Sequence, residues 1–164
     1  MPALTLWQRE MVRFFRQRNR VVSTMATPLV FWLIIGSGFS SSFVASGSAQ
    51  GGSAGYMAYF FPGTVMLMLM FAAIFSTISV IEDRREGFLQ TVMVAPMPRV
   101  ALVMGKVLGG ASVATIMGIV FLAFWPLIGT WPGWVAAAGT VGVMFLVAIE
   151  LTAFGLLLAW PMES

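Results

Sequence analysis

The chain contains no cysteine and no histidine, and it carries few charges of either sign. Without cysteine it can form no disulfide, and without histidine it lacks the commonest metal ligand and the usual general base near neutral pH. Zinc sites and Ser-His or Cys-His active sites have no residues to build them. No stretch has the Gly-x-x-x-x-Gly-Lys-Ser/Thr spacing that cradles ATP phosphates. These absences predict a chain that is not an enzyme and that binds no metal or cofactor directly.

Composition places the chain in a membrane. Hydrophobic residues make up 59% of the sequence and charged residues 9%, and the mean hydropathy is +0.93, whereas soluble proteins carry roughly 25% charged residues. All of the Lys and Arg residues fall within 9–20 and 84–106. Lys and Arg are retained on the cytoplasmic side of membranes, so this distribution predicts a cytoplasmic N-terminus and argues against nucleic-acid binding.

Apolar runs of membrane-crossing length predict an all-α, polytopic membrane helix bundle formed by a single transmembrane domain over residues 1–164. We expect four spans, at residues 21–39, 58–81, 100–126 and 135–159. Residues 40–55 are rich in Ser and Gly and predict a flexible outer loop. Small residues around Gly105 and Gly109 predict close helix packing in the third span. Lys106 is expected to extend toward the inner headgroups.

Residues 4–20 predict an amphipathic interfacial helix, because apolar residues at helical spacing lie opposite a basic face. The residues assigned to it are Trp7, Arg9, Arg13, Arg16 and Arg20. We expect its arginines to lie near anionic headgroups of the inner leaflet. Arg18 falls on the apolar side, where it either reaches the interface or marks a bend into the first span. A charged topogenic flank is the alternative reading.

Two further features need an explanation. Residues 82–99 mix charged and apolar side chains, which predicts a short cytoplasmic helix with a docking surface; a solvated loop is the alternative. Glu150 lies fifteen residues into the fourth span, where a charge facing lipid costs roughly 2.5 kcal/mol or more. Either Glu150 lies on a translocation route or subunit interface, or it is hydrogen-bonded to a hydroxyl such as that of Ser112 or Thr115.

The residues between Phe60 and Lys106 carry a resemblance to a known family. Phe60-Phe61-Pro62-Gly63, Glu82-Asp83-Arg84-Arg85-Glu86-Gly87-Phe88, Val94-Ala95-Pro96 and Gly105-Lys106 follow one another in an order that resembles the membrane subunits of ABC-2 type exporters. The segment at residues 7–20 is similar to the N-terminal elbow helix of that family. The order of elements agrees over essentially the whole chain.

This resemblance implies a bacterial inner-membrane permease that works as a homo- or heterodimer with a separate ABC ATPase, which binds ATP and magnesium. The loop between the second and third spans contributes to coupling in that family. Here the coupling residues would be Glu82, Asp83, Arg84, Arg85, Glu86, Gly87, Phe88, Leu89 and Pro96. Family members usually have six spans, so we expect this chain to be the N-terminal part of a six-helix domain. A fragment of a split permease and a divergent four-span member are the alternatives.

Two other functions stay open at this stage. A small proton-coupled multidrug exporter would use Glu150 as its proton-exchanging carboxylate. A non-transporting membrane scaffold would tolerate changes throughout residues 82–98. The substrate, whether drug, lipid or saccharide, does not follow from the sequence.

Overall fold

The computed structural model describes residues 2–39, 52–85, 87, 99–127 and 133–159. Within these residues the chain is helical and contains no strand, so the predicted all-α class is confirmed. The elements are α1 (Pro2–Arg16), α2 (Arg18–Gly38), α4 (Gly52–Arg85), α6 (Arg99–Leu122), the short 3-10 helix η1 (Trp125–Leu127) and α7 (Trp134–Ala159). In this part of the chain, α2, α4, α6 and α7 are long and apolar enough to cross a membrane.

The observed bounds differ from the expected spans at several ends. The segment expected as one helix at 4–20 is divided at Gln17, and α2 begins at Arg18, where the sequence allowed a bend. Residues 52–55, expected in the outer loop, form the first turn of α4, and residues 40–51 lie outside the described part. Helix α6 ends at Leu122, and the chain continues into η1, which contains Pro126. A proline lacks the backbone donor that a continuing α-helix needs.

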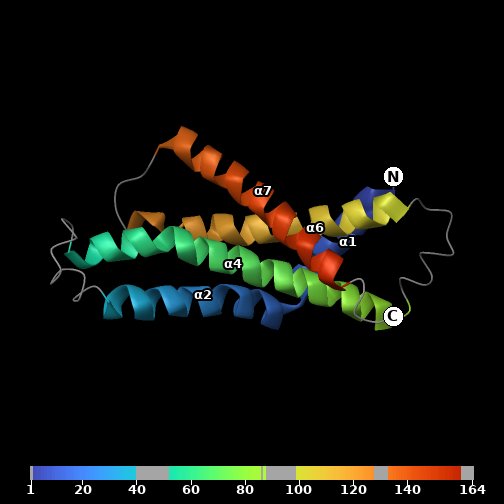
Figure 1. Cartoon of the computed structure of the whole chain (residues 1–164), viewed down its shortest axis with the longest axis horizontal. Helices are drawn as coiled ribbons and strands as arrows, with labels where there is room; N and C mark the ends of the chain where they lie inside the picture. The colour runs from blue at the N-terminus through green and yellow to red at the C-terminus, as the bar shows by residue number, and fades with distance from the viewer. Residues whose placement is uncertain (1, 40–51, 86, 88–98, 128–132, 160–164) are drawn as a thin grey trace.

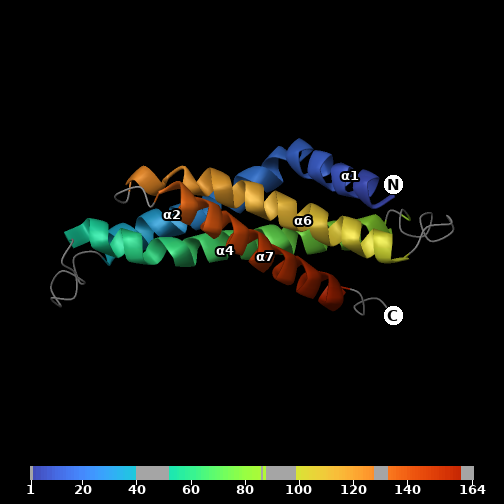
Figure 2. The same cartoon turned by 90° about the horizontal axis from the view of Figure 1, so that it is seen from above.

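The helices share one long axis, with α4 and α6 at the centre (Figures 1 and 2). Helix α2 packs on α4, and α7 crosses the α4–α6 pair at an angle. Helix α1 lies along the first half of α6 (Figure 2). The start of α1, the end of α4 and the start of α6 therefore meet at one end of the bundle.

Glycines on α6 allow its neighbours to approach closely, as the sequence predicted. A Cβ atom at Gly105 would lie 2.8 Å from Leu6 Cβ, and one at Gly109 would lie 2.8 Å from Glu10 Cβ. On another side of α6, a Cβ at Gly110 would collide with the Ser76 side chain of α4. Because glycine has no side chain, α6 contacts both α1 and α4 closely at the adjacent positions Gly109 and Gly110.

Aromatic side chains pack at the opposite end of the bundle. The ring centroids of Phe61 and Phe121 are 5.2 Å apart, and Trp32 lies edge-on at 5.7 Å from Phe61. Trp32 Nε1 also donates to the carbonyl oxygen of Met57 at 3.2 Å. These contacts join α2, α4 and α6 at the end of the bundle opposite the junction of α1, α4 and α6.

The helix lengths can be compared with the thickness of a membrane. At 1.5 Å per residue, the 21 residues of α2 extend about 31 Å, close to the roughly 30 Å of a hydrocarbon core. The 34 residues of α4 extend about 51 Å by the same rise. Because Trp32 of α2 is bonded to Met57 near the start of α4, the excess length of α4 lies mostly at its other end, where Glu82 and Asp83 are found.

Candidate functional site

Charged side chains from four helices form an ionic cluster at the end of the bundle where α1, α4 and α6 meet. We define this ionic cluster by its members, Arg9, Glu10, Arg13, Arg20, Ser79, Glu82, Asp83 and Lys106. Arg9, Glu10 and Arg13 come from α1, Arg20 from α2, Ser79, Glu82 and Asp83 from α4, and Lys106 from α6. The cluster therefore joins the N-terminal helix to three of the candidate membrane spans.

Lys106 lies inside the cluster and does not extend to the headgroups, contrary to our expectation. Its side chain is 3% exposed, and its Nζ donates to the carboxylates of Glu10 and Asp83. Ser79 Oγ lies 3.4 Å from this Nζ and donates to Glu10 Oε2 at 3.0 Å. Removing an ion from water costs several kcal/mol unless close partners compensate it. The lysine is retained because two carboxylates offset that cost, and only the folded packing of α1 supplies Glu10.

Asp83 is the centre of the cluster. Its carboxylate is 0% exposed and accepts two hydrogen bonds from the Arg9 guanidinium, at 2.9 and 3.3 Å. It also accepts bonds from Arg13 and Lys106. A carboxylate buried in this way cannot contact another protein directly, so Asp83 stabilises the junction of α1, α4 and α6 from the inside.

Glu82 ties the bend between α1 and α2 to α4. Its carboxylate accepts from Arg13 Nη2 at 3.1 Å and from Arg20 Nη2 at 2.8 Å. The Arg20 guanidinium also lies 5.8 Å from the ring centroid of Phe75, within the range of a cation–π interaction. Since Arg13 and Arg20 flank the break at Gln17, their shared partner fixes the angle between the two helices.

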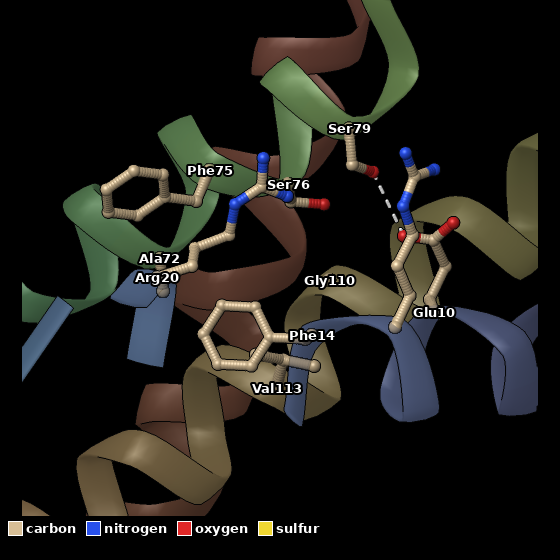
Figure 3. A pocket seen from close by; sticks show the side chains of 10 residues that line it. Glu10, Phe14, Arg20, Ala72, Phe75, Ser76, Ser79, Gly110 and Val113 are labelled. Carbon is tan, nitrogen blue, oxygen red and sulfur yellow. Dashed lines mark hydrogen bonds between the residues drawn. The ribbon is translucent and has the colours of Figure 1, made fainter. Parts of the chain in front are cut away.

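The cavity lined by Glu10, Arg13, Phe14 and Ser79 is too small for a substrate. Figure 3 shows the side chains around it, with the bonded pair Ser79–Glu10 on one side, Phe75 of α4 on the other, and Arg20 between them. The cavity has a volume of about 20 Å³, room for about one water molecule. The geometry of the cluster supports a mechanical role, since it offers bonds between helices and this cavity leaves no space for a reacting molecule.

The predicted interfacial helix is present as α1, but its surroundings differ from those expected. It is packed along the first half of α6. Trp7 Nε1 donates to Ser112 Oγ on α6 at 3.0 Å. Arg9, Arg13 and Arg20 pair with carboxylates of α4 where lipid phosphates were expected as partners. Only folding brings those carboxylates within reach.

The predicted coupling residues begin as a continuation of α4. Glu82, Asp83, Arg84 and Arg85 are its last residues and do not belong to a separate short helix. Arg85 is exposed, and Gly87 has a φ of +72°, a left-handed value that favours glycine after a helix. Glu86, Phe88, Leu89 and Pro96 lie outside the described residues.

Glu150 is exposed on α7, and in the described part of the chain its carboxylate accepts no hydrogen bond. The hydroxyls suggested as its partners are engaged elsewhere. Ser112 accepts from Trp7, and Thr115 donates to the carbonyl oxygen of Ala111 at 2.8 Å. The hydrogen-bonded alternative for Glu150 is therefore wrong with respect to these partners.

Sequence reasoning missed Glu10 and Ser79. One signal was available, because Leu6, Glu10 and Phe14 are spaced four residues apart and so share one helix face. In the structure that face is buried. A carboxylate on an otherwise apolar stripe indicates a buried cation opposite, and Lys106 was the only lysine.

Comparisons with known proteins give one match. The family described as ABC-2 type transporter matches residues 3–163, which covers the ionic cluster and all of the candidate spans. No curated protein and no solved structure matches the chain.

Proposed function

This chain belongs to the ABC-2 type transporter family, and we propose that it forms the translocation path of an ATP-driven exporter and is moved by a separate ABC ATPase. As a family member it is a multi-pass membrane permease. The proposal adds export as the direction, the bacterial inner membrane as the location, and a second permease copy as a partner. ATP and magnesium would bind to the ATPase, because this sequence has no phosphate-binding loop.

The observation that carries the proposal is the position of Asp83. It lies at the end of α4, among the predicted coupling residues, and bonds to Arg9 of α1 and Lys106 of α6. A displacement of the segment after Arg85 would therefore move α4, α1 and α6 together. Packed elements of this kind transmit small shifts at one site into rigid-body motions of helices.

The length of α4 also supports a force that is applied after Arg85 and passed on to the bundle. Its end extends beyond the thickness of a hydrocarbon core, so Glu82 and Asp83 lie at the inner membrane boundary or beyond it. A soluble ATPase can reach residues that follow this end. The ionic cluster lies directly behind them and would receive any force applied there.

Exposed Arg85 offers the sharpest test. We expect Arg85→Glu to abolish co-purification with the ATPase, or substrate-stimulated ATP hydrolysis, while membrane insertion stays normal. Arg85→Lys is the matched control, because it keeps the charge, and Phe88→Asp should behave as Arg85→Glu. Normal association and coupling in Arg85→Glu would refute the docking assignment.

Orientation can be measured independently. Because the chain has no cysteine, a single Arg85→Cys substitution creates its only thiol. A membrane-impermeant maleimide should label it in inside-out membrane vesicles and not in intact cells. Labelling from the outside would overturn the proposed cytoplasmic location of the coupling residues.

The exposure of Glu150 keeps a second candidate open. A carboxylate at this depth in α7 must face protein or water, because a charge facing lipid is costly. We propose that it faces the translocation path or the second permease copy. Drug efflux driven by a pH gradient without an ATPase, and lost in Glu150→Gln, would instead favour a proton-coupled exporter.

A further inference from the structure

The arginines near the break between α1 and α2 do not all belong to the ionic cluster. Arg20 is bonded to Glu82, whereas Arg16 and Arg18 are exposed and form no ion pair within the described part of the chain. Together with Asn19 and Ser23 they border an open hollow of about 650 Å³. Two guanidinium groups beside amide and hydroxyl donors match the chemistry of a phosphate, which arginine binds through paired hydrogen bonds.

A polar atom without a hydrogen-bond partner lies at the same break between the helices. Gln17 lines the hollow, and its side-chain oxygen Oε1 is buried without a hydrogen-bond partner in the described residues. Buried polar atoms are normally bonded, so an orphan of this kind indicates a missing donor. A hydroxyl group carried beside the phosphate would supply that donor.

Membrane depth identifies where the phosphate comes from. Helix α2 is about one hydrocarbon core long, so its first residue, Arg18, lies where inner-leaflet headgroups begin. Exposed apolar side chains stand beside lining residues along the chain, with Val12 and Phe15 ahead of Arg16 on α1 and Val22 ahead of Ser23 on α2. A soluble anion gains nothing from apolar surface near its site, whereas the acyl chains of a lipid would pack against it.

We propose that this hollow binds the phosphodiester headgroup of an anionic, hydroxyl-bearing phospholipid from the inner leaflet. Arg16 and Arg18 hold the phosphate oxygens, Asn19 and Ser23 donate to them, and Gln17 accepts from a headgroup hydroxyl. The lipid would rest against the break between the two helices, next to Arg20 and Glu82 of the ionic cluster. Its binding would then stabilise the angle at which α1 leaves the membrane.

The test uses the full chain, delipidated in neutral detergent without an ATPase and titrated with phosphatidylglycerol or phosphatidylcholine. Native mass spectrometry counts the bound lipids. We expect phosphatidylglycerol to bind more tightly, and Arg16→Gln and Arg18→Gln each to weaken it about fivefold, since one arginine near anionic lipid contributes about that factor. Arg85→Gln is the matched control and should leave binding unchanged, because Arg85 lies ten residues beyond the hollow-lining Phe75 along α4.

Each contrary outcome overturns the assignment. Equal affinity for the two lipids would show that the hollow does not read charge. An equal loss in Arg85→Gln would reduce the effect to general attraction by positive charge. Full displacement of the lipid by millimolar inorganic phosphate would show a site for soluble anions. Because no ATPase is present, none of these results depends on the transport function.

Discussion

Replacing Lys106 by methionine tests whether the ionic cluster stabilises the permease. Methionine keeps most of the side-chain volume and removes the charge, so packing on α6 changes little. Lys106 is 3% exposed and bonds to Glu10 and Asp83, whose side chains are 8% and 0% exposed. Asp83 would keep its two arginines, whereas Glu10 would keep only the Ser79 hydroxyl.

The expected loss follows from that difference. Removing one partner of a buried ion pair leaves an uncompensated charge and costs about 3–5 kcal/mol. For a chain of this size, a loss of 1 kcal/mol lowers Tm by roughly 2–4 °C. Lys106→Met should therefore lower the thermal midpoint by about 10 °C, followed through the intrinsic tryptophan fluorescence of protein in detergent.

A second substitution separates charge from packing. Replacing both members of a buried pair by apolar residues is often neutral or stabilising, so Lys106→Met with Glu10→Met should recover most of the lost stability. The coupling between the two positions should then be about 3 kcal/mol, as for residues in direct contact. A small effect of Lys106→Met, or a double variant as unstable as the sum of the singles, would refute the reasoning.

Two further predictions concern the glycines of α6. Gly110→Val should destabilise the bundle by about 1–3 kcal/mol, as overpacking does, because its Cβ would collide with Ser76. Gly142→Ala on α7 is the control, and it should not destabilise the bundle because a Cβ there meets open space. Equal midpoints for these variants would contradict the close contact. Leu6→Cys with Gly105→Cys should form a disulfide on mild oxidation, seen as an altered gel mobility reversed by reductant. The Cβ positions lie 2.8 Å apart, and a separation of the helices by about 1 Å would bring them to the roughly 3.8 Å of a disulfide. Absence of the crosslink in folded protein would place α1 elsewhere.

The spans were predictable because lipid leaves few choices. A backbone inside the hydrocarbon core must satisfy its own hydrogen bonds, so an apolar run of sufficient length forms a helix. Helix α7 accordingly begins and ends within one residue of the expected span. Helix ends in contact with water or other helices were less predictable, as α4 shows, because its first turn was expected as loop and its last turn as part of a separate helix.

The partners of the charged residues were not predictable from local sequence. The arginines of residues 9–20 were interpreted as ligands for headgroups, because Glu10 is the only acidic residue near them in the sequence. Their actual partners, Glu82 and Asp83, are 62 to 74 residues away along the chain. Arg16 and Arg18 differ from Arg9 and Arg13 only in where the fold places them.

The sequence alone determined the class of the protein. Hydrophobicity indicates the membrane spans and the positions of Lys and Arg indicate the orientation, and both rules hold for membrane proteins in general. The tertiary structure decided which charges are buried. Lys106 and Asp83 are stable inside the bundle only because α1 packs on the glycines of α6 and brings Glu10 and Arg9 to them. Pairing of this kind depends on distances between helices, and no local pattern of residues contains them.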